Sequence, residues 1–561
     1  MTRRRGILSV VVAMLAIVLT ACTGLPTSGP VYYGLSTEDA PDADDVSFLL
    51  PDRPQPGASP EQIVEGFIRA GSGPGLTSNW DRAREFLTPE FRDVWKPQAS
   101  VLVDVFEDRV YSEPDDGVVQ LDVTAVASVD DNGSYERAEL GGRTLPFALE
   151  QNADEEWRIS QAPDGVVLDQ DEFPRVFNRY SVMYFDPSWE YLVPDARWFP
   201  PTNAAASVAA ALVNGPPSSW LAESVADAFP ESVTVVQSVP VSGGVAEVDL
   251  NENALSADPD TLDRMYTQLQ ASLATAGVTE VELTVESTPI DAEPVPVRST
   301  RVPGAPLALT EAGFGFLIGD QLDEIVGLSD VVVDFQPVAV QVSPDRDAAA
   351  ARLDTGAVLR LRDNQTFATL DERESLVDPT IDPHGYIWSV PRDAPAAVRA
   401  YPDEGEFIEV ADAWSGATAI SAMAVSRDGT RVAAVVIAGG RTALWVAGIV
   451  RDPDLVPVRL GDPVQLATVV SSGRGLAWLD DLSVGVLSGD AEGSVVLEQV
   501  VGGISSSSAA SPGMVAIAGG TTLSSVRLLA DDGTLSVKRG TSWQPTATGV
   551  LVLATQQGTP E

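Results

Sequence analysis

The sequence has almost none of the residues that form covalent cross-links or soft metal sites. Its 561 residues include one cysteine, Cys22, and one histidine, His384. A single cysteine excludes an internal disulfide, and cysteine-based or histidine-rich zinc sites are excluded as well. Basic residues are also few, since 35 lysines and arginines stand against 81 acidic residues, which gives a formal charge of −46. Because such a surface repels phosphate backbones, we expect no nucleic-acid partner.

Long apolar runs are scarce too, and the one candidate lies at the N-terminus. The segment Ile7–Leu19 is apolar except for one serine, and Arg3–Arg5 precede it. It is shorter than the roughly 20 residues that span a bilayer as a helix. A basic flank, a short apolar run and small residues before a cleavage point are typical of a secretory signal peptide. The sequence therefore predicts export, with residues 1–21 removed.

The end of this segment, Leu19-Thr20-Ala21-Cys22, resembles the lipobox of bacterial lipoproteins. The resemblance implies cleavage between Ala21 and Cys22, with S-diacylglycerol and N-acyl chains such as palmitate on Cys22. One acyl chain binds a membrane only marginally, whereas two or three hold firmly. We expect a protein anchored by lipid at the extracytoplasmic face of the cell membrane. An ordinary secretory signal with a chance cysteine is the alternative.

The length suggests three or four domains, and the first part of the mature chain has two different patterns. Residues 22–58 are rich in proline and acid, which favours an extended tether. Ser59, Pro60 and Gln62 have the spacing of a helix start with a capping box. After the helical segments, apolar residues alternate with period two from Leu121 to Val129. Residues 59–179 are thus predicted to form an α+β domain, which resembles the NTF2-like kind.

The second unit is predicted over residues 180–288. Asn203 and Gly215 bracket an alanine-rich helix, and Asp258 precedes the clearest amphipathic helix of the chain. The segments Ala210–Pro216 and Val248–Asn251 resemble a GerMN domain, a small α/β module with a binding role. Proline-rich residues 289–306 are interpreted as a linker.

Residues 307–561 consist of short apolar runs and turns, without long amphipathic helices. Three similar turns, each followed by a strand-like run, begin at Ser343, Asp382 and Ser426, with spacings of 39 and 44 residues. These are the lengths of β-propeller blades. The segments at Ala477 and Ser511 are weaker candidates for two more. The region predicts a propeller of about six blades, similar to TolB-like propellers, and a pair of β-sandwiches is the alternative.

Few residues qualify for catalysis. His384 lies in a propeller turn and is interpreted as a turn residue rather than a triad base. Asp130-Asp131-Asn132-Gly133 lacks the spacing of a calcium loop and is interpreted as a turn. We therefore expect no enzyme, no catalytic residues, no metal and no cofactor. Five propeller tryptophans are expected to pack between the blades rather than to line a binding face: Trp388, Trp414, Trp445, Trp478 and Trp543.

The order of lipobox, tether, α+β unit, GerMN-like unit and propeller resembles the LpqB family of actinobacterial lipoproteins over the whole mature chain. The resemblance implies a partner, the extracytoplasmic sensor domain of the histidine kinase MtrB. It further implies that binding modulates two-component signalling in cell-wall homeostasis and division. No binding residue can be carried over, because the family offers no short interaction motif that matches here.

Two other functions stay open at this point. One is binding of cell-wall polymer or a small ligand through the GerMN-like unit. The other is an envelope hydrolase that uses a pair of carboxylates, which 81 acidic residues do not exclude by count. The sequence leaves open the binding face, the sign of any effect on a kinase and the oligomeric state.

Overall fold

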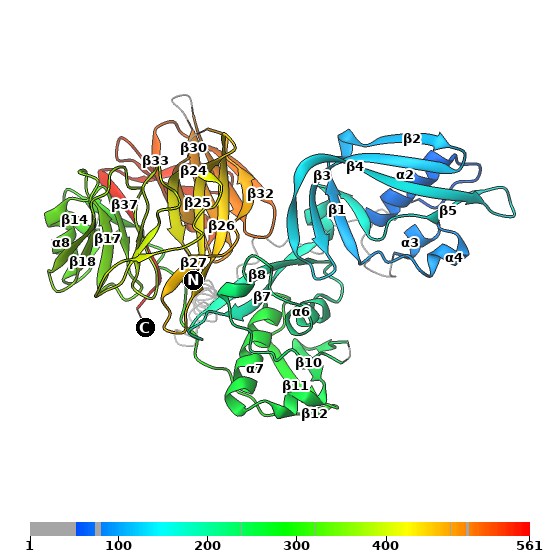
Figure 1. Cartoon of the computed structure of the whole chain (residues 1–561), viewed down its shortest axis with the longest axis horizontal. Helices are drawn as coiled ribbons and strands as arrows, with labels where there is room; N and C mark the ends of the chain where they lie inside the picture. The colour runs from blue at the N-terminus through cyan, green and yellow to red at the C-terminus, as the bar shows by residue number, and fades with distance from the viewer. Residues whose placement is uncertain are drawn as a thin grey trace, which may run out of the picture. The chain divides into compact units, whose positions relative to one another are not determined.

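The computed structural model describes residues 52–72, 80–236, 238–319, 321–471, 473–489 and 493–560. The predicted signal peptide, its cleavage point at Ala21 and Cys22, and most of the tether over 22–58 lie outside the described residues. The described residues form a multidomain, mostly β chain with few helices, as the sequence predicts (Figure 1).

The first part of the chain is an α+β unit. Ser59 and Gln62 form the predicted reciprocal cap: the Ser59 amide donates to Gln62 Oε1 at 3.0 Å, and the Gln62 amide donates to Ser59 Oγ at 3.3 Å. The helix that follows packs its apolar side on the sheet, in one core with the alternating residues of the longest strands. The helices are α2 (Pro60–Ser72), α3 (Asp81–Arg84), α4 (Pro89–Arg92) and α5 (Phe173–Val176). The strands are β1 (Ser100–Asp104), β2 (Val110–Asp115), β3 (Val118–Asp130), β4 (Tyr135–Gln151), β5 (Trp157–Gln161) and β6 (Val166–Asp169).

The sheet of this unit has the order β5-β4-β3-β1-β6, with β2 also paired to β3. The pair β1–β6 is parallel, and β3–β4 is a long antiparallel hairpin. Its turn is the predicted Asp130–Gly133 turn, in which Asp130 Oδ1 accepts from the amides of Asn132 and Ser134 at 3.0 and 2.8 Å. The resemblance to NTF2-like domains stays a prediction.

The second part begins with an antiparallel hairpin, which is followed by a small sheet of order β12-β11-β10-β9. Strands β10 and β11 are parallel, and helix α7 connects them. Asp258 caps α7 as predicted, since its side chain accepts from the Thr261 amide at 3.1 Å. The helices are α6 (Ala204–Val213) and α7 (Pro259–Ala274). The strands are β7 (Asn178–Phe185), β8 (Leu192–Phe199), β9 (Val241–Ser242), β10 (Val245–Leu250), β11 (Glu280–Val285) and β12 (Thr288–Pro289).

Two local predictions in this part are wrong. Asn203 precedes α6, but it has a φ of 62° and its side chain makes no capping hydrogen bond. The sequence Val233–Val236 is strand-like, but it forms only an isolated bridge, from Val235 to Leu250. Residues 290–306 form neither helix nor strand. The predicted limits of the units stay predictions; the sheets follow one another in the same order along the chain.

The C-terminal part is a β-propeller, and within the described residues its strands form six sets of four or five. The first two sets are β37-β13-β14-β15 and β16 to β19, which join through the parallel pair β37–β16. The other four are β20 to β23, β24 to β28, β29 to β32 and β33 to β36. Strand β37, the last of the chain, pairs with β13, so the first set combines strands from both ends of this region. The predicted propeller of about six blades is confirmed.

The elements of the propeller are as follows. The first two sets contain β13 (Leu307–Thr310), β14 (Gly313–Ile318), β15 (Gln321–Glu324), α8 (Leu328–Phe335), β16 (Ala339–Val342), β17 (Ala348–Arg352), β18 (Val358–Arg362), β19 (Phe367–Asp371) and β37 (Val550–Gln556). The next two contain β20 (Thr380–Ile381), β21 (Ile387–Ser389), β22 (Arg399–Tyr401), β23 (Ile408–Glu409), β24 (Ala417–Val425), β25 (Arg431–Ala438), β26 (Arg441–Arg451), β27 (Pro457–Leu460) and β28 (Val464–Thr468). The last two contain β29 (Gly473–Trp478), β30 (Ser483–Gly489), β31 (Ser494–Val500), β32 (Ser505–Ala510), β33 (Met514–Ala518), β34 (Arg527–Ala530), β35 (Leu535–Arg539) and β36 (Ser542–Ala547).

The sequence repeats occupy equivalent positions in this architecture. The turns at Ser343, Asp382 and Ser426 each connect the first two strands of a set, and the turn at Asp480 does the same. In each, a side-chain oxygen accepts from backbone amides of the turn or of the next strand. The segment at Ser511 is different, because it lies between β32 and β33 and so connects two sets. It does not mark a blade in the way that the other turns do.

Candidate functional site

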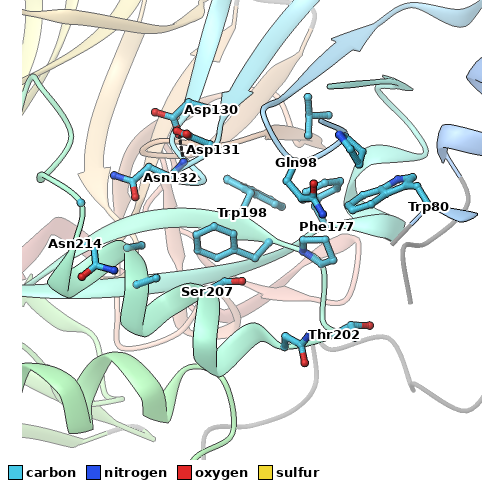
Figure 2. A pocket seen from close by; sticks show the side chains of 18 of the residues that line it. Trp80, Gln98, Asp130, Asp131, Asn132, Phe177, Trp198, Thr202, Ser207 and Asn214 are labelled. Carbon is cyan, nitrogen blue, oxygen red and sulfur yellow. Dashed lines mark hydrogen bonds between the residues drawn. The ribbon is translucent and has the colours of Figure 1, made fainter. Parts of the chain in front are cut away.

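A cavity of about 940 Å³ lies where the first part of the chain meets the second (Figure 2). Its wall from the first part includes the β3–β4 turn and the segment before β1. The wall from the second part consists of the end of β8, the segment that follows it, one side of α6 and the residues directly after α6. The aromatic residues of the lining are Trp80, Phe177, Trp198 and Phe199.

Trp198 fixes the geometry of this cavity. Its amide donates to Gly133 O at 2.8 Å, which ties β8 to the β3–β4 turn. Its indole Nε1 donates to Gly502 O at 2.9 Å, which ties the same residue to the propeller. Figure 2 shows Trp198 at the centre of the lining, with Asp130 and Asn132 on one side and Trp80 on the other. Trp198 therefore forms a fixed part of the cavity wall, and its indole N–H already donates a hydrogen bond within the protein.

Asn132 and Gly215 approach closely from the two sides of the cavity. A Cβ atom at Gly215 would lie 2.3 Å from Asn132 Nδ2, so any larger residue at this position would force the Asn132 side chain to move. The sequence pointed to Gly215 as the end of a helix, whereas the structure shows that it also makes room for a side chain from the β3–β4 turn.

The polar lining suits a ligand with many hydroxyl or amide groups. Carboxylates, side-chain amides and hydroxyls of the lining supply both donors and acceptors: Gln98, Asp130, Asp131, Asn132, Thr202, Asn203, Ser207 and Asn214. Aromatic rings beside such groups offer an apolar face to the same ligand. Sequence reasoning missed this site, because its residues come from five separate segments and form no motif.

A second candidate surface is a groove of about 600 Å³ in the propeller, between α8, the β13–β14 turn and the start of β19. We call it the rim groove. Phe335 and Phe367 form an edge-to-face pair there, with ring centroids 4.6 Å apart, and Phe367 is 56% exposed. Four exposed carboxylates line the groove, and none forms an ion pair within the described residues: Glu311, Glu324, Asp330 and Asp334.

His384 does not form a catalytic triad within the part of the chain that the structure describes. Its Nε2 has no hydrogen-bond partner there and lies 3.9 Å from Asp186 Oδ2. Its amide donates to Asp382 Oδ1 at 3.0 Å, which confirms the interpretation as a turn residue. Burial and the nearby Arg451 guanidinium lower the pKa of His384, while the carboxylates of Asp382, Asp186 and Glu190 oppose them.

The five propeller tryptophans pack in the interior of the propeller. Trp388, Trp414 and Trp478 are buried in apolar clusters of the propeller. Trp445 packs against the cluster of Trp388 and Trp414, and Trp543 packs against another, so their role in packing is confirmed. Within the residues that the structure describes, no group of three or more histidine, cysteine or acidic residues could hold a metal ion. No helix in those residues has both the length and the apolar character to cross a bilayer.

Three family models match the chain. Residues 53–174 match "Lipoprotein LpqB, N-terminal domain", and residues 314–552 match "Lipoprotein LpqB beta-propeller domain". Residues 181–291 match the Germane model, described as "Sporulation and spore germination". The matches confirm the predicted GerMN domain and the propeller.

Curated relatives named Lipoprotein LpqB extend over much of the chain. The protein of Thermobifida fusca is 32% identical over 46% of this chain and 42% of its own length. The protein of Bifidobacterium longum is 25% identical over 83% of each chain. That of Cutibacterium acnes is 25% identical over 89% of this chain and 81% of its own length.

Solved structures also overlap with the chain. One, from a nidogen/laminin complex, is 9% identical with a TM-score of 0.32, and the overlap covers 44% of this chain and 96% of that one. A putative TolB from Agrobacterium tumefaciens is 12% identical with a TM-score of 0.25, over 32% of this chain and 65% of that one.

Proposed function

We propose that this chain, which belongs to the LpqB family of lipoproteins, is a non-catalytic binding protein held by lipid on Cys22 at the outer face of the cell membrane. Its proposed partner is the extracytoplasmic sensor domain of the kinase MtrB. Binding modulates two-component signalling in cell-wall homeostasis and division. The observation that carries the proposal is the rim groove, where the exposed Phe367 and the half-buried Phe335 lie among carboxylates that have no ion pair within the described residues.

Both features of the rim groove suit a protein partner. Large aromatic side chains supply much of the binding free energy in protein interfaces, and an exposed one is free to be buried. The four carboxylates favour a partner surface with basic residues and speed association with it. The chain as a whole carries a charge of −46, so electrostatic selection of a basic partner is strong.

Replacing Phe367 with alanine is expected to weaken binding of the MtrB sensor domain by at least about tenfold, as for an aromatic residue at the centre of an interface. Residues 23–561, produced without lipid, are titrated with the soluble sensor domain of the same organism by calorimetry. Phe106→Ala is the matched control, because Phe106 is 58% exposed but lies in the first unit. Saturable binding that both variants retain would place the contact elsewhere, and no binding by the unaltered chain would remove the partner.

The aromatic and polar cavity favours a second candidate function, the binding of cell-wall polymer. Polysaccharides with N-acetyl groups present hydroxyls and amides around apolar ring faces, which the lining could match. In this function the GerMN-like unit contributes α6 and the end of β8 to the site.

Ser207→Phe is expected to reduce binding to isolated wall polymer at least tenfold, because Ser207 lines the cavity from α6 and a phenyl ring would occupy it. Sedimentation of the protein with the insoluble polymer measures the affinity. Ser256→Phe, an exposed position in the same unit that is absent from the lining, is the control. Equal co-sedimentation of both variants would rule out this cavity as the polymer site.

A further inference from the structure

The first unit contains a cavity of its own, of about 360 Å³, which lies between the C-terminal half of α2 and the sheet. It is separate from the cavity beside Trp198 and from the rim groove, and nothing in the proposed function uses it. Most of its lining is apolar: Phe67, Ile68, Trp95, Leu102, Leu145, Pro146, Phe147, Pro163, Val166 and Val167. The polar side chains of the lining are Ser100, Arg143, Thr144 and Asp164.

Three aromatic rings give this cavity a rigid wall. Phe67 packs against Trp95, with centroids 5.0 Å apart, and against Phe147, with centroids 6.2 Å apart. All three are nearly fully buried in the core of the unit. The wall is therefore formed before any ligand arrives, which lowers the entropy cost of binding.

One wall residue has an unsatisfied polar atom. Trp95 is 2% exposed, and its indole Nε1 has no hydrogen-bond partner within the described residues. The rest of the residue is firmly held, because Arg84 donates to the Trp95 carbonyl at 3.3 Å and stacks over its ring at 5.4 Å. Buried indole N–H groups are normally paired, and leaving one without a partner is unfavourable.

The lining also includes the positively charged side chain of Arg143. Arg143 is exposed on β4, and its guanidinium forms no ion pair or hydrogen bond within the residues that the structure describes. By contrast, Arg109 of the same unit is held by Asp104 at 2.7 Å. The Asp164 carboxylate in the lining is engaged by the Lys96 amide at 3.0 Å, and the Thr144 hydroxyl donates to Asp122. The Arg143 guanidinium, which has no partner among the described residues, lines an otherwise largely apolar cavity and complements an anion.

We propose that this cavity binds an amphipathic anion, a molecule with one apolar chain or ring and a single carboxylate or phosphate head. The apolar body fills the space against Phe67, Trp95 and Phe147, and the head pairs with Arg143. Fatty acids in solution and acyl lipids of a bilayer share this chemistry. The proposal does not depend on the MtrB partner or on wall polymer.

The test compares three ligands of equal chain length against residues 23–561 produced without lipid. Calorimetry is expected to show saturable binding of dodecanoate, at least tenfold tighter than that of dodecan-1-ol or dodecylamine. Arg143→Gln is expected to remove the preference for the carboxylate, whereas Arg441→Gln, an exposed arginine of the propeller, keeps it. Val167→Phe, which fills the cavity, is expected to abolish binding of all three.

Two further measurements separate the ligand sources and guard against misfolded variants. Dodecanoate is expected to shift the indole N–H resonance of Trp95, assigned by its loss in Trp95→Phe. The protein is also mixed with vesicles of phosphatidylglycerol or of phosphatidylcholine. Extraction of lipid from the phosphatidylglycerol vesicles would show that the ligand comes from the bilayer, and binding of dodecanoate alone would show that it is a free acid. The proposal is overturned if no ligand saturates, or if the unaltered chain and Arg143→Gln bind all three ligands equally.

Discussion

Replacing Arg431 with leucine is expected to lower the free energy of unfolding of the propeller by about 3–5 kcal/mol, the typical cost of leaving one buried charge without its partner. Arg431 is buried, and its guanidinium pairs with the buried carboxylate of Asp428. It also donates to the Pro194 carbonyl at 3.2 Å and stacks over Trp478 at 4.9 Å. One side chain thus joins two sheets of the propeller and the β7–β8 hairpin.

The pH dependence of this loss has a defined sign. Burial raises the pKa of Asp428, but Arg431 and Thr430 lower it by more than burial raises it. The pKa of Asp428 therefore lies below its ordinary value of 3.8. A carboxylate with a lowered folded pKa contributes stability above its unfolded pKa and loses it as the pH falls. Arg431→Leu lacks the guanidinium that lowers this pKa, so its Asp428 takes up a proton at a higher pH than in the unaltered chain. The difference in stability between the two should therefore shrink as the pH falls towards about 4 and below it.

Urea denaturation, with hydrogen exchange of β24 to β26 as a local readout, measures the effect. Arg459→Ala is the control, because its pair with Glu223 spans 2.7 Å at the surface and should contribute at most about 1 kcal/mol. The double variant Arg431→Leu/Asp428→Asn is expected to recover part of the loss, since it removes the unpaired charge. Equal stabilities of Arg431→Leu and Arg459→Ala would show that the buried pair has no special role.

The sequence predicted the helix caps and turns that depend on hydrogen bonds between residues close together in the chain. The capping box at Ser59 and the cap at Asp258 appear with the expected hydrogen bonds. The propeller turns were visible in the sequence because each uses the same arrangement, a serine or aspartate side chain that accepts from backbone amides of the turn or of the next strand. The prediction that Asn203 caps α6 was wrong, because its backbone is in the left-handed region and its side chain accepts no hydrogen bond from the helix amides.

The candidate sites could not be predicted in the same way. The aromatic cavity combines Trp80, Asn132, Trp198 and Ser207, which come together only through tertiary packing. Arg143 and the Trp95 indole N–H stand out because neither has a partner among the described residues, and no pattern in the sequence predicts that. Even for Gly215, the sequence predicts only the end of a helix. Its close approach to Asn132, in a turn distant in sequence, is visible only in the structure.

Replacing residues 1–21 with a secretory leader and Cys22 with serine is expected to move the protein from the membrane fraction to the soluble exported fraction almost completely. Each acyl CH₂ buried in the membrane contributes about 0.8 kcal/mol, so two or three chains account for nearly all of the attachment. The acidic surface adds no attraction to anionic headgroups. Fractionation followed by mass spectrometry of the N-terminal peptide measures both location and lipid. Thr23→Ala in the natural chain, which keeps Cys22, is the control.

The released variant also separates attachment from recognition. Its affinity for the MtrB sensor domain in solution should equal that of residues 23–561, because the rim groove is unchanged. Its effect on kinase output in cells should nevertheless fall sharply, since a shared membrane surface raises the effective concentration of the two proteins without any new contact. A released variant that restores full output at the same expression level would show that the lipid anchor is dispensable. A variant without Cys22 lipid that stays on the membrane would show that another part of the chain binds there.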